Sequence, residues 1–147
     1  MLNELKDVHG RMREAIAELA SILSEPTPDF QALPKARMTI TRVSGQWRTL
    51  IQCVILPALK DISPAQAKQL DELRREAAEF AVRKSEHIAR WNNRATEADI
   101  AGYLRASAGM RRSLLARIER EAAILYPLLE DKAAAGALPA YGVSEQI

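Results

Sequence analysis

The sequence predicts an all-α protein, an antiparallel up-down-up-down four-helix bundle. Over long stretches its apolar residues recur at alternating intervals of three and four, the spacing of one helix face. Prolines and small polar residues interrupt this spacing at a few places, which predicts short connections and therefore antiparallel neighbours. The composition, 48% hydrophobic and 27% charged with 5% aromatic residues, favours helix over strand in a globular chain.

A first helix is predicted at about residues 2–24. Its apolar stripe keeps intervals of three and four throughout: Leu2, Leu5, His9, Met12, Ile16, Leu19 and Leu23. Because His9 lies on this stripe, its side chain is expected to face the bundle interior. Two prolines within residues 25–30 should end the helix.

A second helix is predicted at about residues 35–60. Its inward residues keep helical spacing: Ile40, Val43, Trp47, Leu50 or Ile51, and Val54. Residues 38–43 are rich in β-branched side chains, which favour strands, but no second strand is available to pair with them. A bend is expected at Gly45, and Pro57 should kink or finish the helix.

A third helix is predicted at about residues 64–94, with Ser63 as its N-cap and Pro64 at its first position. Its inner row also alternates three and four: Leu70, Leu73, Ala77, Phe80, Lys84, His87 and Trp91. This row becomes polar toward its end. Lys84 and His87 are therefore expected to face inward or lie at an edge, where Lys84 can extend its amine to water.

The last main helix is predicted at about residues 107–133. If His87 lies at the level of Arg117, the midpoint of the connection falls near Gly102, so the chain needs extra length there. A short helix or irregular turn is therefore expected at about residues 97–106.

Polar residues on the inner rows predict a polar cluster at the bundle centre. Arg117 and Glu121 interrupt an apolar row of the last helix, and His9 and His87 lie on inner rows elsewhere. Two residues on consecutive antiparallel helices lie at the same level, that is, at the same height along the bundle axis, when the loop between the helices is midway between them in the sequence. By this criterion Trp47 shares a level with His9 and with His87.

Length, charge and cysteine content limit the classes of function. A chain of 147 residues is expected to form one domain, here residues 1–136, with a tail at 137–147 that is loose or packed on the outside. A net charge of +2 does not favour nucleic-acid binding, and no stretch reaches the ~20 apolar residues of a membrane span. The single Cys53 and the lack of a signal-like N-terminus predict a reducing, cytoplasmic setting.

Four stretches resemble one known family: residues 5–13, 50–57, 85–90 and 117–129. They are similar to the hemerythrin-like, or HHE cation-binding, domains, four-helix bundles in which inward His and carboxylate residues hold a di-iron centre. The first stretch resembles the opening helix with its ligand at His9, and the third resembles the third helix around His87. The last resembles the pattern of His, three residues, Glu and an apolar run into Pro. The resemblance implies a bacterial protein.

The chain departs from the family at the positions that would bind iron. Trp47 and Ile51 stand where the resemblance implies the second-helix His and Glu, and Arg117 stands at the fourth-helix His. Trp91 stands where a further His is frequent. His9, His87 and Glu121 remain, whereas a di-iron site usually needs five or more protein ligands. The metal site is therefore expected to be lost, with Arg117 pairing Glu121 and supplying positive charge.

The chain is accordingly expected to act as a non-enzymatic binding or regulatory module without a cofactor. The identity of its small-molecule ligand is unknown. A protein partner or a homodimer is expected, and neither nucleic acid nor a membrane. The alternative is a metal-binding hemerythrin-like protein that senses oxygen, redox state or metal with non-haem iron at His9, His87 and Glu121. Histidine phosphotransfer through His9 is a third reading, but that chemistry needs an exposed His and the stripe turns His9 inward.

Overall fold

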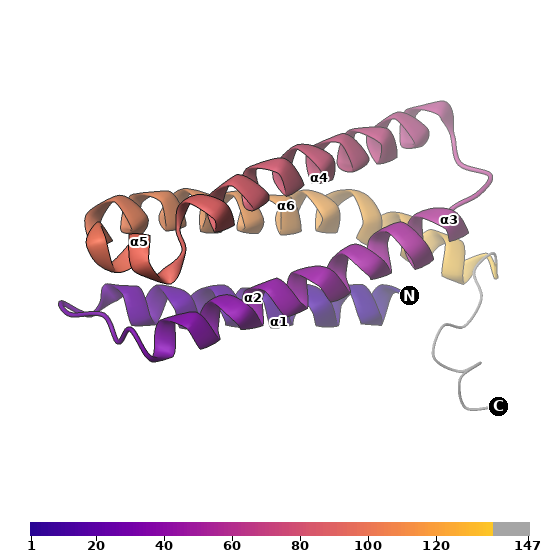
Figure 1. Cartoon of the computed structure of the whole chain (residues 1–147). Helices are drawn as coiled ribbons and strands as arrows, with labels where there is room; N and C mark the ends of the chain where they lie inside the picture. The colour runs from indigo at the N-terminus through magenta and orange to yellow at the C-terminus, as the bar shows by residue number, and fades with distance from the viewer. Residues whose placement is uncertain (137–147) are drawn as a thin grey trace.

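The computed structural model describes residues 1–136 and is all-α, with four long helical segments (Figure 1). The helices are α1 (Leu2–Ser24), α2 (Ala32–Thr49), the π-helix η1 (Leu50–Ile55), α3 (Leu56–Ala58), α4 (Pro64–Arg90), α5 (Asn93–Ala98) and α6 (Ile100–Ala134). The predicted all-α class is confirmed, as is a short helix between the third and fourth long segments. The tail expected at 137–147 lies outside the described residues.

Successive long segments run in opposite directions, as Figure 1 shows. α1 packs against α2 and against α6, and α6 also packs against α4. Within residues 1–136, α2 and α4 are not among the closely packed pairs, so the side of the bundle between them is its looser side. None of the described helices is long and apolar enough to cross a membrane.

The second long segment differs from the prediction in where it is irregular. Gly45 lies inside the regular helix α2, and the irregularity is the π-helix η1, immediately before Pro57. Proline lacks an N–H, and in a regular helix its ring collides with the carbonyl four residues earlier. A wider turn, in which the Leu56 N–H donates to the carbonyl of Ile51, relieves that collision.

Side-chain caps determine where the third and fourth long segments begin and end. Ser63 accepts a hydrogen bond from the Gln66 N–H and forms a capping box, so α4 begins at Pro64 as predicted. Asn92 caps α5 and Asp99 caps α6. The short helix is therefore 93–98, earlier than the predicted 97–106, and α6 begins about two turns before the predicted residue 107.

Gly102 is required at the start of α6, because a Cβ atom there would meet the Asp99 carboxylate and lie 2.8 Å from the Trp91 ring. Gly102→Ala is expected to destabilise the protein by about 1–3 kcal/mol through overpacking. In Gly109→Ala, in the same helix, the new methyl group meets only the Arg112 guanidinium at an ordinary contact of 3.9 Å, and the change is expected to stabilise by about 0.5–1 kcal/mol. Urea unfolding of both variants checks the prediction, and the same sign for both would contradict it.

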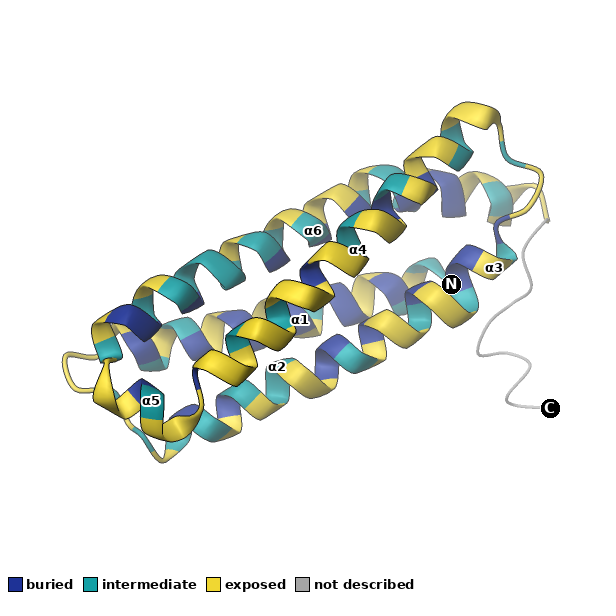
Figure 2. Cartoon of the chain, turned by 45° about the horizontal axis from the view of Figure 1, so that its top comes forward, coloured by how far each residue is buried: buried dark blue, intermediate teal, exposed yellow. Residues whose placement is uncertain are grey.

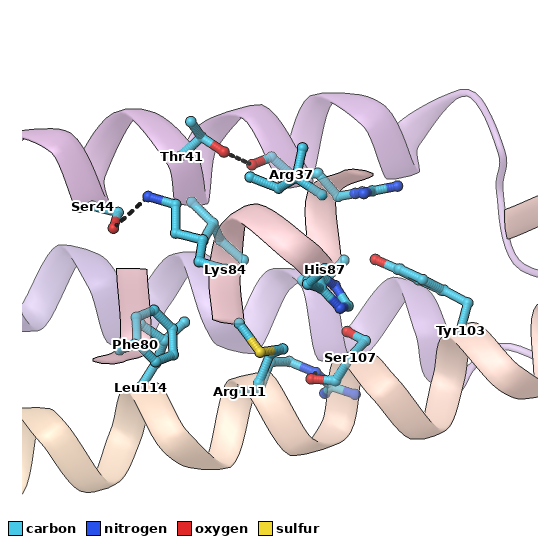
Figure 3. A pocket seen from close by; sticks show the side chains of 14 residues that line it. Arg37, Thr41, Ser44, Phe80, Lys84, His87, Tyr103, Ser107, Arg111 and Leu114 are labelled. Carbon is cyan, nitrogen blue, oxygen red and sulfur yellow. Dashed lines mark hydrogen bonds between the residues drawn. The ribbon is translucent and has the colours of Figure 1, made fainter. Parts of the chain in front are cut away.

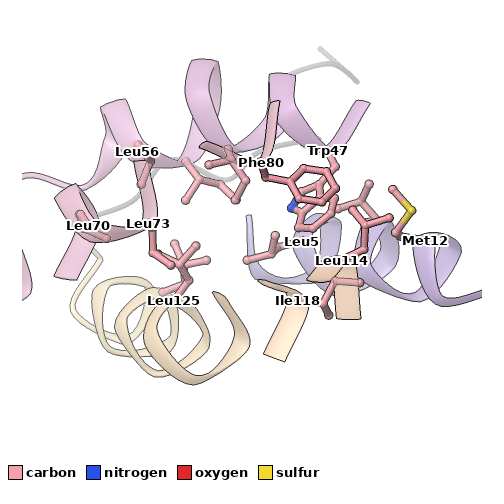
Figure 4. Close-up of a cluster of buried hydrophobic side chains, with 14 of the residues drawn as sticks. Leu5, Met12, Trp47, Leu56, Leu70, Leu73, Phe80, Leu114, Ile118 and Leu125 are labelled. Carbon is pink, nitrogen blue, oxygen red and sulfur yellow. The ribbon is translucent and has the colours of Figure 1, made fainter. Parts of the chain in front are cut away.

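Two clusters of buried apolar side chains fill the bundle, and the outer face of α4 is largely exposed (Figure 2). The larger cluster joins all four long segments and contains Trp47, Phe80 and Ile118 (Figure 4). The smaller one lies at the α5 end and contains Trp91 and Tyr103. Tertiary packing of these inner faces, more than helix propensity, stabilises helices of this kind.

Candidate functional site

A closed network of polar side chains lies inside the larger cluster, with the Glu121 carboxylate at its centre. Glu121 is 3% exposed and His9 is fully buried. The ring N–H of Trp47 donates to Glu121 Oε1 over 2.7 Å, and His9 Nε2 lies 2.9 Å from the same oxygen. Arg117 Nη2 lies 3.5 Å from Glu121 Oε2. Three helices, α1, α2 and α6, thus supply partners to one buried carboxylate.

Arg117 lies mostly inside the bundle, with 14% of its side chain exposed. Its guanidinium lies 4.1 Å from the centre of the Trp47 ring and 5.6 Å from that of Phe80. Burial lowers the pKa of Arg117, while the charge of Glu121 opposes that shift. The guanidinium remains protonated and offsets the negative charge of the carboxylate.

Tyr126 completes the network and was not singled out from the sequence. Its hydroxyl lies 2.6 Å from His9 Nδ1, so it donates to that atom when His9 carries its proton on Nε2 and donates to Glu121. Burial raises the pKa of the Tyr126 hydroxyl, which keeps it a donor near neutral pH. Its position five residues after Glu121, a little more than one helical turn, was the available signal.

The network leaves Glu121 poorly suited to hold a metal ion, because neighbouring side chains already occupy both carboxylate oxygens. Within residues 1–136, no three His, Cys, Asp or Glu side chains gather closely enough to hold an ion. The Arg117 guanidinium would repel a cation beside Glu121. Ile51 lines the same cavity of about 220 Å³ as Glu121, so an apolar side chain stands where the family resemblance implies a carboxylate. The residues present therefore do not fit a di-iron centre.

The structure brings His9, Arg117 and Glu121 together and places His87 elsewhere. On α4, Phe80 packs against Arg117, and His87 lies seven residues further, about 10 Å along the helix. The chain turns at residues 59–63, so Trp47 shares its level with Phe80. Trp91 belongs to the smaller apolar cluster. The third long helix is therefore shifted along the bundle axis by about two turns from the position that the sequence predicted for it.

A pocket of about 80 Å³ lies beside the network, on the looser side of the bundle between α2 and α4 (Figure 3). Its apolar walls come from all four long segments: Leu19, Ile40, Phe80, Ile88, Met110 and Leu114. Its polar lining consists of Arg37, Thr41, Ser44, Lys84, His87, Tyr103, Ser107 and Arg111. The sequence placed Lys84 and His87 on an inner row but did not indicate the pocket, which depends on the distance between two helices.

His87 lies half-buried in this pocket, with its ring stacked on Tyr103 at a centroid distance of 6.0 Å. Burial, and then the positive charge of Arg37, lower the pKa of His87 below 6.5. Arg37 faces it from α2, Tyr103 and Arg111 line the same pocket from α6, and Lys84 does so from α4. None of these groups carries a negative charge near neutral pH.

Protonation of His87 is therefore expected to destabilise the fold. Below pH 6.5 the unfolded chain takes up a proton at His87 before the folded chain does, so the free energy of unfolding falls as the pH drops through this range. His87→Asn should remove that part of the fall. Urea unfolding between about pH 7.5 and 5 measures it, and parallel pH profiles for the two proteins would contradict it.

Comparison of the chain with protein-family models, curated proteins and solved structures finds no match. The function is therefore inferred from the two features described above, the buried network around Glu121 and the pocket beside it.

Proposed function

We propose that the chain is a non-enzymatic binding module, a hemerythrin-like bundle that has exchanged its metal site for a side-chain network and binds a small molecule in the adjacent pocket. The antiparallel arrangement supports the family resemblance. So does the proximity of His9, Trp47 and Glu121, which the resemblance assigns to ligand positions on three different helices. A cytoplasmic setting belongs to the same proposal and rests on the single cysteine.

The observation that carries the proposal is the pocket itself. The pocket opens to solvent beside Thr41 and Ile88, and its volume of about 80 Å³ is several times the roughly 10–15 Å³ that one water requires. Its lining combines apolar walls with a few polar groups that converge from several helices, as small-molecule sites usually do. The network next to it holds the neighbouring side chains in place, which favours a preformed site.

One contact in the pocket could suggest catalysis, but its surroundings argue against it. Lys84 Nζ lies 3.2 Å from Ser44 Oγ, and burial, with the nearby charges of Arg48 and Arg117, lowers the pKa of Lys84. A lysine of this kind activates a serine nucleophile in some hydrolases. Ser44, however, lies inside α2, where backbone N–H groups are engaged in the helix and cannot form an oxyanion hole. The proposal is therefore of binding without turnover.

Metal content separates this proposal from the metal-sensing alternative. Protein purified without chelator, then offered Fe(II) anaerobically before exposure to air, is expected to retain no iron and to keep its melting temperature. The matched control is the same preparation treated with chelator throughout. About two irons per chain, with near-ultraviolet charge-transfer bands, would instead support the alternative that uses His9, His87 and Glu121.

A spectroscopic titration tests binding in the pocket. Small organic compounds, charged and neutral, are added to isotope-labelled protein, and backbone amide resonances are followed. At least one compound is expected to move resonances of the pocket residues on α2, α4 and α6 while those around Glu121 stay in place. Failure of every compound, or shifts confined to other surfaces, would contradict the proposal.

A further inference from the structure

The pocket beside the Glu121 network carries an excess of positive charge. Arg37 from α2, Lys84 from α4 and Arg111 from α6 all line it, and His87 adds a group that can become charged. Figure 3 shows these side chains around the same space. No Asp or Glu is among the fourteen lining residues. Within residues 1–136, none of the three cations forms an ion pair with a carboxylate.

Neutral partners hold each cation in place while part of its hydrogen-bonding capacity stays available. Lys84 donates to the Ser44 hydroxyl, and Arg111 Nε donates to the carbonyl of Ser107 over 3.3 Å. The Arg37 guanidinium lies 5.2 Å from the centre of the Tyr103 ring. A guanidinium has five N–H donors and an ammonium three, so each group can still donate to a ligand.

The energetics of these cations favour an anion. Burial is the main cause that lowers the pKa of both Lys84 and Arg111; charges outside the pocket add to it, those of Arg48 and Arg117 for Lys84 and that of Arg112 for Arg111, where Tyr103 opposes the shift. A partly desolvated cation gains from a nearby negative charge, and hydrogen bonds from charged donors to a carboxylate are among the stronger polar contacts. A bound anion would offset the lost solvation and accept those bonds.

The apolar walls and the size of the pocket indicate which non-polar group is attached to the anion. Phe80, Met110 and Leu114 form an apolar surface facing the cations, which suits a hydrocarbon body better than a small inorganic ion. A volume of about 80 Å³ is several times the roughly 10–15 Å³ that one water requires. Thr41 and Ile88 are exposed members of the lining, so the end of a longer chain can project toward solvent there.

We propose that this pocket binds a short aliphatic monocarboxylate, with the carboxylate held by basic side chains of the lining and the hydrocarbon chain against Phe80, Met110 and Leu114. This inference rests on the proposed binding function and names its ligand class. The occupant is thus an organic acid with a few carbon atoms, distinguished from inorganic anions by its chain and from neutral lipids by its charge.

The experiment uses the ring proton signals of the two histidines, since the chain contains only His9 and His87. His87 lines the pocket and reports binding, while His9 is buried in the Glu121 network and serves as an internal control. Sodium hexanoate, the neutral analogue hexanamide and sodium phosphate are titrated at constant ionic strength. Hexanoate is expected to shift the His87 signal and to bind about tenfold or more tightly than hexanamide, because only its carboxylate accepts charge-assisted bonds.

Variants locate the interaction. Lys84→Met and Arg111→Met are tested separately: loss of the cation that contacts the carboxylate is expected to weaken hexanoate binding by about tenfold, and a change in neither would overturn the assignment. Arg42→Met, which removes an exposed charge of α2 outside the pocket, should leave binding unchanged. Equal losses in all three variants would indicate a general charge effect and would overturn the assignment. Melting temperatures verify that each variant is folded, and the comparison of hexanoate with hexanamide needs no variant.

The possible outcomes distinguish this inference from the proposed function. If hexanamide binds as tightly as hexanoate, the ligand is not selected by charge, so the inference fails while the binding function stands. If phosphate shifts the His87 signal as strongly as hexanoate does, the ligand needs no hydrocarbon chain, and the assignment of an aliphatic acid is wrong. If none of the three compounds moves the His87 signal, the inference fails, and if the broader panel also leaves the pocket unaffected, the binding function fails with it.

Discussion

Replacing Glu121 with alanine is expected to lower the free energy of unfolding by about 3–5 kcal/mol. The substitution removes the common partner of His9, Trp47 and Arg117, so a largely buried guanidinium and a buried indole N–H lose their acceptor. An unpaired charge in the interior costs far more than the net value of the pair that it formed. The loss is measured by urea unfolding at neutral pH.

Glu119→Ala is the matched control, since Glu119 is an exposed glutamate on the same helix and should change stability by no more than about 0.5 kcal/mol. Glu121→Gln keeps an acceptor for Trp47 but removes the negative charge, and it should fall between the two. A loss below about 1 kcal/mol for Glu121→Ala, within the usual range for a single neutral hydrogen bond, would mean that the network contributes little to stability.

Replacing Trp47 with alanine is expected to lower the free energy of unfolding by about 3–5 kcal/mol. The ring is 1% exposed and touches His9 edge-on with a centroid distance of 5.6 Å, while Arg117 lies over its face. Its removal leaves a cavity, deprives Glu121 of a donor and ends the cation–π contact. Urea unfolding followed by circular dichroism measures the loss, because the change removes one of the two tryptophans.

Trp47→Phe is the control that separates volume from hydrogen bonding. It retains an aromatic ring but has no N–H, so it should cost about 1–3 kcal/mol, mainly for the lost donor to Glu121. If the two variants lose the same stability, the filled volume contributes nothing beyond the hydrogen bond. Trp47 would then stabilise the bundle only through its hydrogen bond to Glu121.

Both predictions concern the polar network around Glu121. The sequence and the family resemblance indicated some of its residues but not all of them. The sequence indicated that Arg117 and Glu121 interrupt an apolar row and that His9 faces inward, and these three residues do meet. His87 does not join them, because the level of α4 depends on where its connection turns. The chain turns at residues 59–63, so Phe80 and not His87 lies at the level of Trp47.

Features that depend on residues close in the sequence were predicted more accurately than the positions of the helices relative to one another along the bundle axis. The Ser63 cap and the Pro64 start were predicted because a cap acts within one turn. The start of α6 lies about two turns earlier than predicted, because Asp99 caps the helix there. Trp91 and Gly102 pack together there, and that contact joins residues from two helices.

The helical class, the inward face of each long helix and the presence of an arginine and a glutamate on one inner row could all be predicted from the amino-acid sequence. These features follow from a 3.6-residue period and from local caps, which involve residues close in the chain. The hydrogen bonds of Tyr126 and Trp47 to the polar centre, and the basic pocket between α2 and α4, are seen only in the folded chain. Such features depend on how far apart two helices lie and how they are staggered, which is set by packing of the whole core.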